Sequence, residues 1–184
     1  MPGNARLRER RLEPVRTHQQ ASKQAFAHWG AGRFAEAVQG YAASIALVRD
    51  SGLPAIADLH AQLAGVLDAQ GRLMEAVAQS ELALAAEQAQ AGATDAGPTM
   101  KVARHFLADR LVRNGQPQRA LEVLAPSLAA LPDDWLLNLT RAEALWAAGR
   151  AADAKAAAGR SLGNASAEET RAQLVERLAA VLAS

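Results

Sequence analysis

The residue types that could do chemistry are few and scattered in this chain. The four histidines, His18, His28, His60 and His105, lie far apart, and none belongs to a His–x3–His pair or an HExxH motif that would hold a metal. The chain has no cysteine, which excludes disulfides and thiolate chemistry. No Gly-rich phosphate-binding loop occurs. We therefore expect no enzymatic activity, no metal and no cofactor.

The adjacent acids do not form a general acid–base pair. Asp133–Asp134 and Glu168–Glu169 both fall at the expected start of a helix, where the positive end of the helix dipole favours negative charge. We therefore interpret them as helix-start residues rather than as catalytic carboxyls.

Composition limits the kinds of partner. The formal net charge is +1, and the 21% of charged residues are of mixed sign, which argues against the clustered basic face of a nucleic-acid binder. No run approaches 18 apolar residues, and the N-terminus lacks the apolar core of a signal peptide. We expect a cytoplasmic protein without a membrane span and without nucleic acid as a partner.

The composition also predicts an all-α fold. Half of the 184 residues are hydrophobic but only 4% are aromatic, and Ala, the strongest helix former, is abundant. No window alternates apolar and polar residues for long enough to make a strand.

One short pattern occurs four times and marks the turns of helical hairpins. The copies read AGRFAEAVQGYAASIAL from Ala31, QGRLMEAVAQSELAL from Gln70, NGQPQRALEVLAPSL from Asn114 and AGRAADAKAAAGRSL from Ala148. In each, a Gly ends one helix and an apolar helix follows. The predicted helices span 17–30, 33–50, 54–70, 73–91, 98–114, 117–131, 133–148, 151–162 and 166–182.

Residues at the predicted helix ends support these boundaries. A left-handed backbone is expected just after each first helix, at Gly32, Gly71, Gly115 and Gly149. Pro54 and Pro117 suit a first helical turn. Ser166 and Glu169 predict a capping box at the start of the last helix.

Aligned on the Ala after each turn, the copies resemble tetratricopeptide repeats. These alanines are Ala37, Ala76, Ala120 and Ala154, and the last two are 34 residues apart, the period of that family. A small residue recurs in each first helix (Ala25, Ala64, Ala108, Ala142), and a second one recurs seven residues after the aligned Ala (Ser44, Ala83, Ser127, Ser161).

The resemblance implies a right-handed superhelical array of antiparallel helix pairs. We expect a basic, flexible leader at residues 1–16, four hairpins over 17–164, and a capping helix and tail over 165–184. Arg171, Glu176 and Arg177 are expected on the wet outer face of that cap.

In this family the first helices line a concave surface that binds partners. The corresponding i, i+3, i+7, i+10 stripe predicts a mildly acidic groove with apolar ends. Whether Trp29 and Trp146 face this groove or the core stays open. The candidate binding residues are Phe26, Trp29, Asp58, Asp68, His105, Asp109, Val112, Arg113, Leu136, Glu143 and Trp146.

The resemblance favours a non-enzymatic scaffold or adaptor that binds a peptide or helix of another protein, with basic and apolar residues. Two alternatives stay open: a dedicated chaperone or assembly subunit of a bacterial secretion or envelope system, and a regulatory subunit that acts on an enzyme in trans. The Ala-rich helices and the apolar cap also permit a homodimer.

Overall fold

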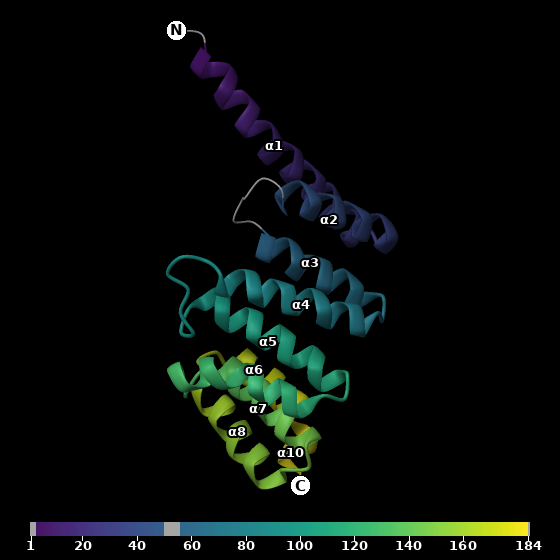
Figure 1. Ribbon diagram of the computed structural model, residues 1–184. Coiled ribbons are helices and arrows are strands. Elements are labelled where there is room, and N and C mark those ends of the chain that lie inside the picture. Colours follow the sequence, from purple (N-terminus) through teal and green to yellow (C-terminus); the bar gives the residue numbers. More distant parts are fainter. Residues whose placement is uncertain (1–2, 50–55, 184) are drawn as a thin grey trace. The chain divides into compact units, whose positions relative to one another are not determined.

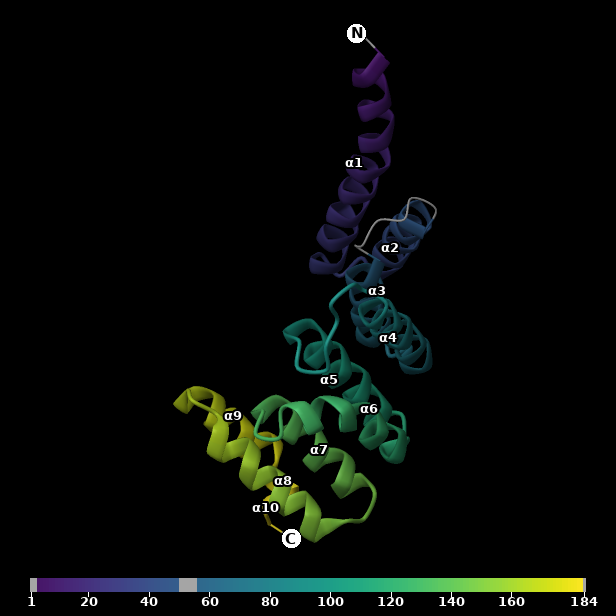
Figure 2. The ribbon, with the colours of Figure 1, turned by 60° about the vertical axis from the view of Figure 1, so that its left-hand side comes forward.

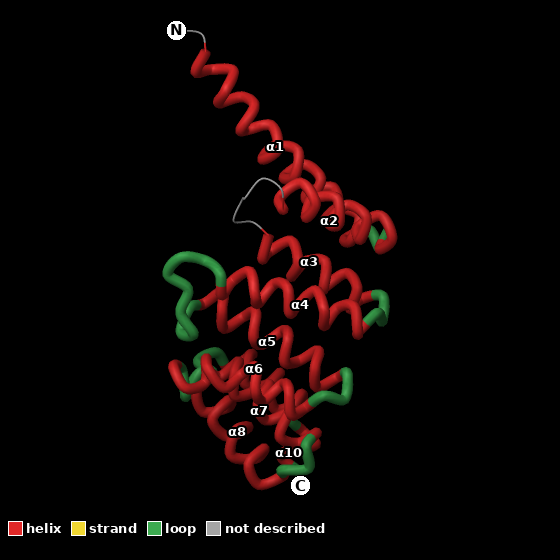
Figure 3. The backbone as a smooth tube through the Cα atoms, in the orientation of Figure 1, coloured by secondary structure: helices red, strands yellow, loops and turns green. Residues whose placement is uncertain are grey.

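The computed structural model describes the backbone of residues 3–49 and 56–183 and the side chains in these ranges from Thr17 onward. All regular secondary structure in these ranges is helical (Figures 1 and 3). The helices are α1 (Gly3–Gly30), α2 (Phe34–Arg49), α3 (Ile56–Ala69), α4 (Leu73–Gln88), α5 (Pro98–Arg113), α6 (Pro117–Ala130), α7 (Trp135–Ala147), α8 (Ala151–Asn164), α9 (Glu168–Arg177) and α10 (Ala179–Leu182). None of the helices in the described part is long and apolar enough to cross a bilayer. The chain divides into two compact units, Met1–Gln90 and Ala91–Ser184.

The first unit consists of two helical hairpins. α1 pairs with α2 and α3 with α4, and α2 packs against α3. The core between them includes the fully buried Tyr41 and Val66. The α1–α2 pair is very close: a Cβ added at Gly40 would lie 2.8 Å from the Cβ of Ala25. Only a residue without a side chain fits there.

The second unit has two hairpins and a terminal cap. α5 pairs with α6 and α7 with α8, while α7 also packs against both α5 and α6. Figure 2 shows α9 and α10 beside α8, and α10 also contacts α7. Leu174 of α9, Leu178 at the break between the two helices and Val181 of α10 are buried in the core that α7 and α8 form.

The four hairpin turns share one backbone geometry, as the repeated pattern predicts. Gly32, Gly71, Gly115 and Gly149 have φ values between 71° and 75°. At the first of these turns, the N–H of Gly32 donates to the Trp29 carbonyl and that of Arg33 to the His28 carbonyl, both at 2.9 Å. The same two bonds recur at the other three turns. This is the Schellman motif, which needs a left-handed residue and therefore favours Gly.

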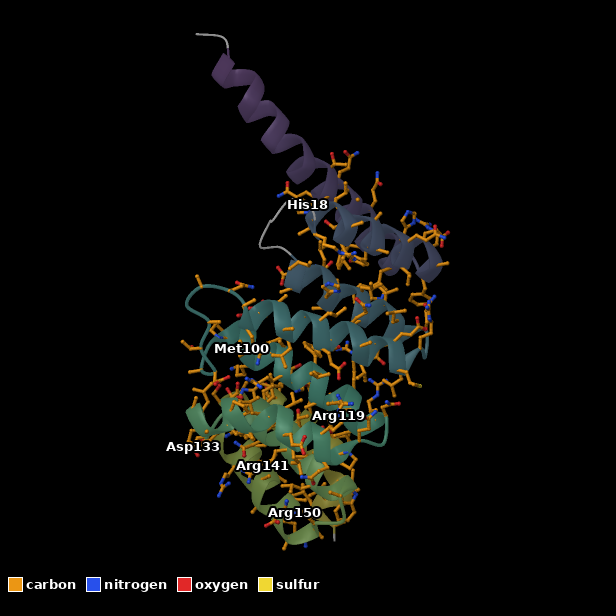
Figure 4. All side chains as sticks on the ribbon, viewed as in Figure 1. His18, Met100, Arg119, Asp133, Arg141 and Arg150 are labelled. Carbon is orange, nitrogen blue, oxygen red and sulfur yellow. The ribbon has the colours of Figure 1, made fainter. Side chains whose placement is uncertain are left out.

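The small residues of the repeat occupy buried crossing points, as predicted. The four aligned alanines and the four alanines of the first helices are all 0% exposed. Three repeats also carry a serine in the second helix whose hydroxyl reaches a backbone carbonyl in, or just before, the first helix of the same hairpin. Ser161 Oγ donates to the Trp135 carbonyl at 2.8 Å, and Ser127 Oγ donates to the Asp95 carbonyl at 2.6 Å. Ser44 Oγ lies 3.4 Å from the carbonyl of His18, which Figure 4 labels on α1.

Three predictions at the helix ends need correction or fall outside the described residues. α1 begins at Gly3 rather than near residue 17, so the backbone of residues 3–16 is helical. The flexibility and role of the basic leader stay predictions, because the side chains of 1–16 lie outside the described residues. Pro54 also lies outside them.

The predicted helix over 166–182 is interrupted at Leu178 and forms α9 and α10. The predicted capping box is wrong, because the N-cap of α9 is Ala167 and no side chain caps it. Ser166 therefore stands one position too early to act as the cap.

Candidate partner-binding site

A pocket of about 540 Å³ lies in the second unit, between α5, α7 and the terminal helices. It is lined by Asp109, Val112, Arg113, Glu143, Trp146, Ala147, Arg177, Ala180 and Val181. Five of these residues were predicted from the sequence to face the concave surface. The pocket therefore brings together part of the predicted stripe and adds a wall from α9 and α10.

The nine lining residues form three columns with an interval of 34 residues. One column is charged: Asp109, Glu143 and Arg177. A second is apolar: Val112, Trp146 and Ala180. The third holds Arg113, Ala147 and Val181. Because this interval is the repeat period of α5 and α7, the residues of α9 and α10 stand where the first helix of a fifth repeat would place them.

The burial of the cap fits this correspondence. Leu174 and Leu178 are equivalent to Thr140 and Ala144 of α7, and all four are buried. α9 and α10 therefore pack on the preceding repeat with the same face that α7 uses. The pocket therefore lies on equivalent faces of α5, α7 and the terminal cap.

Within the charged column, Arg177 forms hydrogen bonds to both Glu143 and Asp109. Arg177 Nε donates to Glu143 Oε1 at 2.5 Å, and Nη2 donates to Glu143 Oε2 at 2.8 Å and to Asp109 Oδ1 at 2.6 Å. Arg113 Nη1 lies 3.5 Å from Asp109 Oδ2. Arg177 was expected on the wet outer face of the cap, and that expectation is wrong because its side chain turns into the pocket. The predicted acidic surface is thus charge-balanced within the second unit.

Burial and the ion pair act in opposite directions on Glu143. Burial raises the pKa of its carboxyl, while the hydrogen bond and positive charge of Arg177 lower it, and the net direction is upward. The pKa of Arg177 is raised, first by its hydrogen bond to Glu143. Arg177 therefore favours the ionised form of Glu143 against the effect of burial.

The apolar column supplies a contact surface beside these charges. Trp146 is 37% exposed and lines the pocket, which answers for this residue the question that the sequence left open. Val112 is half-buried at the equivalent position of α5. An exposed aromatic ring in a concave site can anchor an apolar side chain of a partner.

Two predicted residues of the second unit lie elsewhere. His105 is buried, with Nδ1 2.6 Å from Thr140 Oγ1, and burial lowers its pKa to about 4. It therefore presents almost no surface to a partner and joins α5 to α7 instead. Leu136, in the first turn of α7, is half-buried and does not line the pocket.

The other predicted residues belong to the first unit. Trp29 packs against the core, and its Cη2 would lie 2.7 Å from a Cβ at Gly65, so the absence of a side chain there makes room for the ring. Phe26 is 61% exposed and meets Trp29 edge to face, with ring centroids 6.3 Å apart. Asp58 is exposed and Asp68 half-buried.

Sequence reasoning missed Arg177, Ala147, Ala180 and Val181. The signal for Arg177 and Ala180 was the 34-residue period, which extends beyond the fourth repeat into the terminal helix. No group of three or more His, Asp or Glu residues in the described part could hold a metal.

No family model and no curated protein matches the chain, but solved structures do. The TPR-like repeats of a putative kinesin light chain from Podosopora anserina are 22% identical over 92% of this chain and 94% of that chain, with a TM-score of 0.65. BtubC (BKLC) from P. vanneervenii is 15% identical over 95% and 82%, with a TM-score of 0.71. MamA from Desulfovibrio magneticus RS-1 is 15% identical over 90% and 93%, with a TM-score of 0.63.

At these identities the likeness concerns the fold alone. It confirms the predicted all-α tetratricopeptide-repeat solenoid.

Proposed function

We propose that this tetratricopeptide-type protein is a non-enzymatic scaffold that binds a peptide or helical segment of another protein in the pocket of its second unit. The supporting observation is the apolar column of Val112, Trp146 and Ala180, which two consecutive repeats and the terminal cap present beside a charged column. Each repeat contributes one residue to each column. An extended or helical segment that follows the repeats meets the same pair of surfaces at each step.

The chemistry of the pocket indicates what such a segment carries. Trp146 and Val112 offer an aliphatic side chain a surface to cover. The neighbouring carboxylates and guanidinium groups balance one another, so the pocket accepts polar backbone atoms without a large net charge. An apolar anchor flanked by polar atoms therefore suits the site.

The first unit supplies a second candidate contact area. Phe26 is exposed and Asp58 lies at the surface, so we retain these two residues as partner contacts. Trp29 then packs edge to face against Phe26 from the core side. The cytoplasmic location and the homodimer expected from the sequence stay predictions.

The test is site-specific photo-crosslinking. A benzoylphenylalanine placed at Ala147, which is exposed and lines the pocket, is compared with one at Ala156, which is exposed on α8 away from it. In cells of the source organism, we expect a discrete crosslinked partner from position 147 and none from position 156. Mass spectrometry identifies the partner.

A second substitution makes the assignment specific. Trp146→Ala should remove the crosslink at position 147, because the partner loses its anchor. Val175→Ala, which trims a 50% exposed residue of α9 that does not line the pocket, should leave it unchanged. Equal crosslinking from positions 147 and 156 would show that the pocket is not the binding site, and a crosslink that survives Trp146→Ala would show that Trp146 is not the anchor.

A further inference from the structure

The charged column contains a guanidinium group that the chain itself provides. Arg177 donates two hydrogen bonds to Glu143, through Nε and Nη2, and the same Nη2 also donates to Asp109. These contacts join α9 to residues 34 and 68 positions earlier in the chain. Fork-like contact with carboxylates is how arginine is recognised generally, so the two acids form a complete guanidinium site.

The two acids come from equivalent positions of consecutive repeats. Asp109 follows the crossing residue Ala108 in α5, and Glu143 follows Ala142 in α7. Their side chains are both only 20% exposed, so two negative charges stand close together with little water around them. Such a pair requires a cation, because burial of an unpaired charge is costly.

Arg177 is not needed to hold the terminal helices in place. Leu174, Leu178 and Val181 are 0–3% exposed in the core with α7 and α8 and anchor both α9 and α10. The Arg177 side chain is itself 42% exposed, and the apolar contacts of these three residues do not involve its ion pairs. Its guanidinium can therefore leave the two acids while the helices remain docked.

An arginine from outside would meet favourable neighbours at the same place. Trp146 lines the pocket beside the acids and can cover the aliphatic part of an incoming side chain or stack on its guanidinium. The partner would then satisfy the charged column and the apolar column together. Arg177 would be free to turn to solvent.

We propose that Arg177 is an internal competitor: it occupies the Asp109–Glu143 site until a partner segment with an arginine next to an aliphatic residue displaces it. The proposal rests on the proposed function, since it concerns the same pocket. It goes further, because it names the partner's side chain and makes the terminal helix a regulator of binding.

The experiment uses two matched peptides on the full chain. One is acetyl-Ala-Leu-Arg-Leu-Ala-amide, and the other has citrulline, which is uncharged and nearly isosteric, in place of arginine. Binding is followed by NMR titration of the Trp146 indole N–H, assigned with Trp146→Phe. The proteins are the natural chain, Arg177→Gln, and Arg177→Gln combined with Asp109→Asn and Glu143→Gln.

We expect the arginine peptide to bind Arg177→Gln about two- to fivefold more tightly than the natural chain. In the natural chain, the peptide must first displace the partly exposed guanidinium of Arg177 from the acids. The citrulline peptide should not discriminate between these two proteins. The triple variant should lose the preference for arginine. Arg177→Lys, which keeps the charge but loses the fork, should fall between Arg177→Gln and the natural chain.

Two results would overturn the proposal. If Arg177→Gln binds the arginine peptide no better than the natural chain does, Arg177 does not compete. If both peptides bind Arg177→Gln equally, the acids are not a guanidinium site. A circular dichroism melt of each variant checks that the helices are intact. The photo-crosslinking test keeps Arg177 in place, so the proposed function can survive the failure of this inference.

Discussion

Arg177 Nε lies 2.5 Å from Glu143 Oε1, and these two residues are 34 positions apart, the same interval that separates the last two repeats. The terminal helix thus takes part in the repeat rather than merely closing it. Because equivalent positions of stacked repeats come into register, residues one period apart line up as columns. The contact between Arg177 and Glu143 is one step of such a column, and Asp109 is the next.

The ionisation of Glu143 should depend on Arg177. Burial already raises the pKa of this carboxyl, and the hydrogen bond and charge of Arg177 partly offset the rise. In Arg177→Gln we therefore expect the pKa of Glu143 to move further upward. Carbon-13 NMR titration of the Glu143 carboxyl in both proteins measures this directly.

The raised pKa of Glu143 makes the stability of the protein depend on pH, and the direction of this dependence follows from proton binding. A carboxyl with a raised pKa binds its proton more tightly in the folded state, so stability is fully present below the unfolded pKa and falls as the pH rises through the folded pKa. The loss should be larger in Arg177→Gln than in the natural chain. An unchanged Glu143 titration in the variant would mean that Arg177 does not control this carboxyl.

His105 should make the second unit sensitive to acid. Burial lowers its pKa to about 4, whereas an unfolded histidine titrates near 6.5. Below pH 6.5, His105 binds a proton in the unfolded chain but stays neutral in the folded chain until the pH approaches about 4. Stability is therefore fully present above that pH and declines as the pH falls to about 4, by roughly 3 kcal/mol in total.

The measurement is urea unfolding of the natural chain and of His105→Gln at pH 7.0 and pH 5.0. Glutamine retains a polar group opposite Thr140 but does not titrate, so the variant should lose less stability between the two pH values. Equal losses in both proteins would assign the acid sensitivity to other groups. The two proteins share every other titratable side chain, so the difference isolates His105.

The repeat turns require glycine for a backbone reason that a matched pair of substitutions can isolate. Gly149 has a φ of 75°, and any other residue there costs roughly 1–2 kcal/mol. Gly159 lies inside α8 with no atom within 4 Å of an added Cβ. Alanine at position 159 should instead stabilise the protein by about 0.5–1 kcal/mol.

Thermal unfolding monitored by circular dichroism compares Gly149→Ala with Gly159→Ala. We expect the melting temperatures to move in opposite directions from that of the natural chain. Both substitutions add the same methyl group at exposed positions, so burial does not differ between them. A shift of the same sign in both would contradict the assignment of the turn to a left-handed conformation.

The local elements of the fold could be predicted because their causes are local. A glycine ends a helix in a left-handed turn wherever it stands, and four such glycines with alanines at a fixed interval predict hairpins and their crossings. The four aligned alanines are buried as expected. The boundary of α1 was missed because residues 3–16 lack the apolar period that marks a packed helix.

The lining of the pocket was predicted only in part. Asp109, Val112, Arg113, Glu143 and Trp146 lie in one pocket, because they share a helix face in consecutive repeats. His105 belongs to the same stripe, yet it is buried against Thr140, since α7 packs on that side of α5. Helical periodicity assigns a residue to a face but does not say how far the neighbouring helix covers it.

By itself, then, the amino-acid sequence determined the all-α class, the turns and the residues of the hairpin crossings. Each depends on backbone preference or on contacts within one hairpin. Only the tertiary structure decided that Arg177 neutralises Asp109 and Glu143 and that Trp146 lines a pocket. The reason is the docking of α9: burial of Leu174 and Leu178 sets its rotation, and that rotation turns Arg177 toward Asp109 and Glu143.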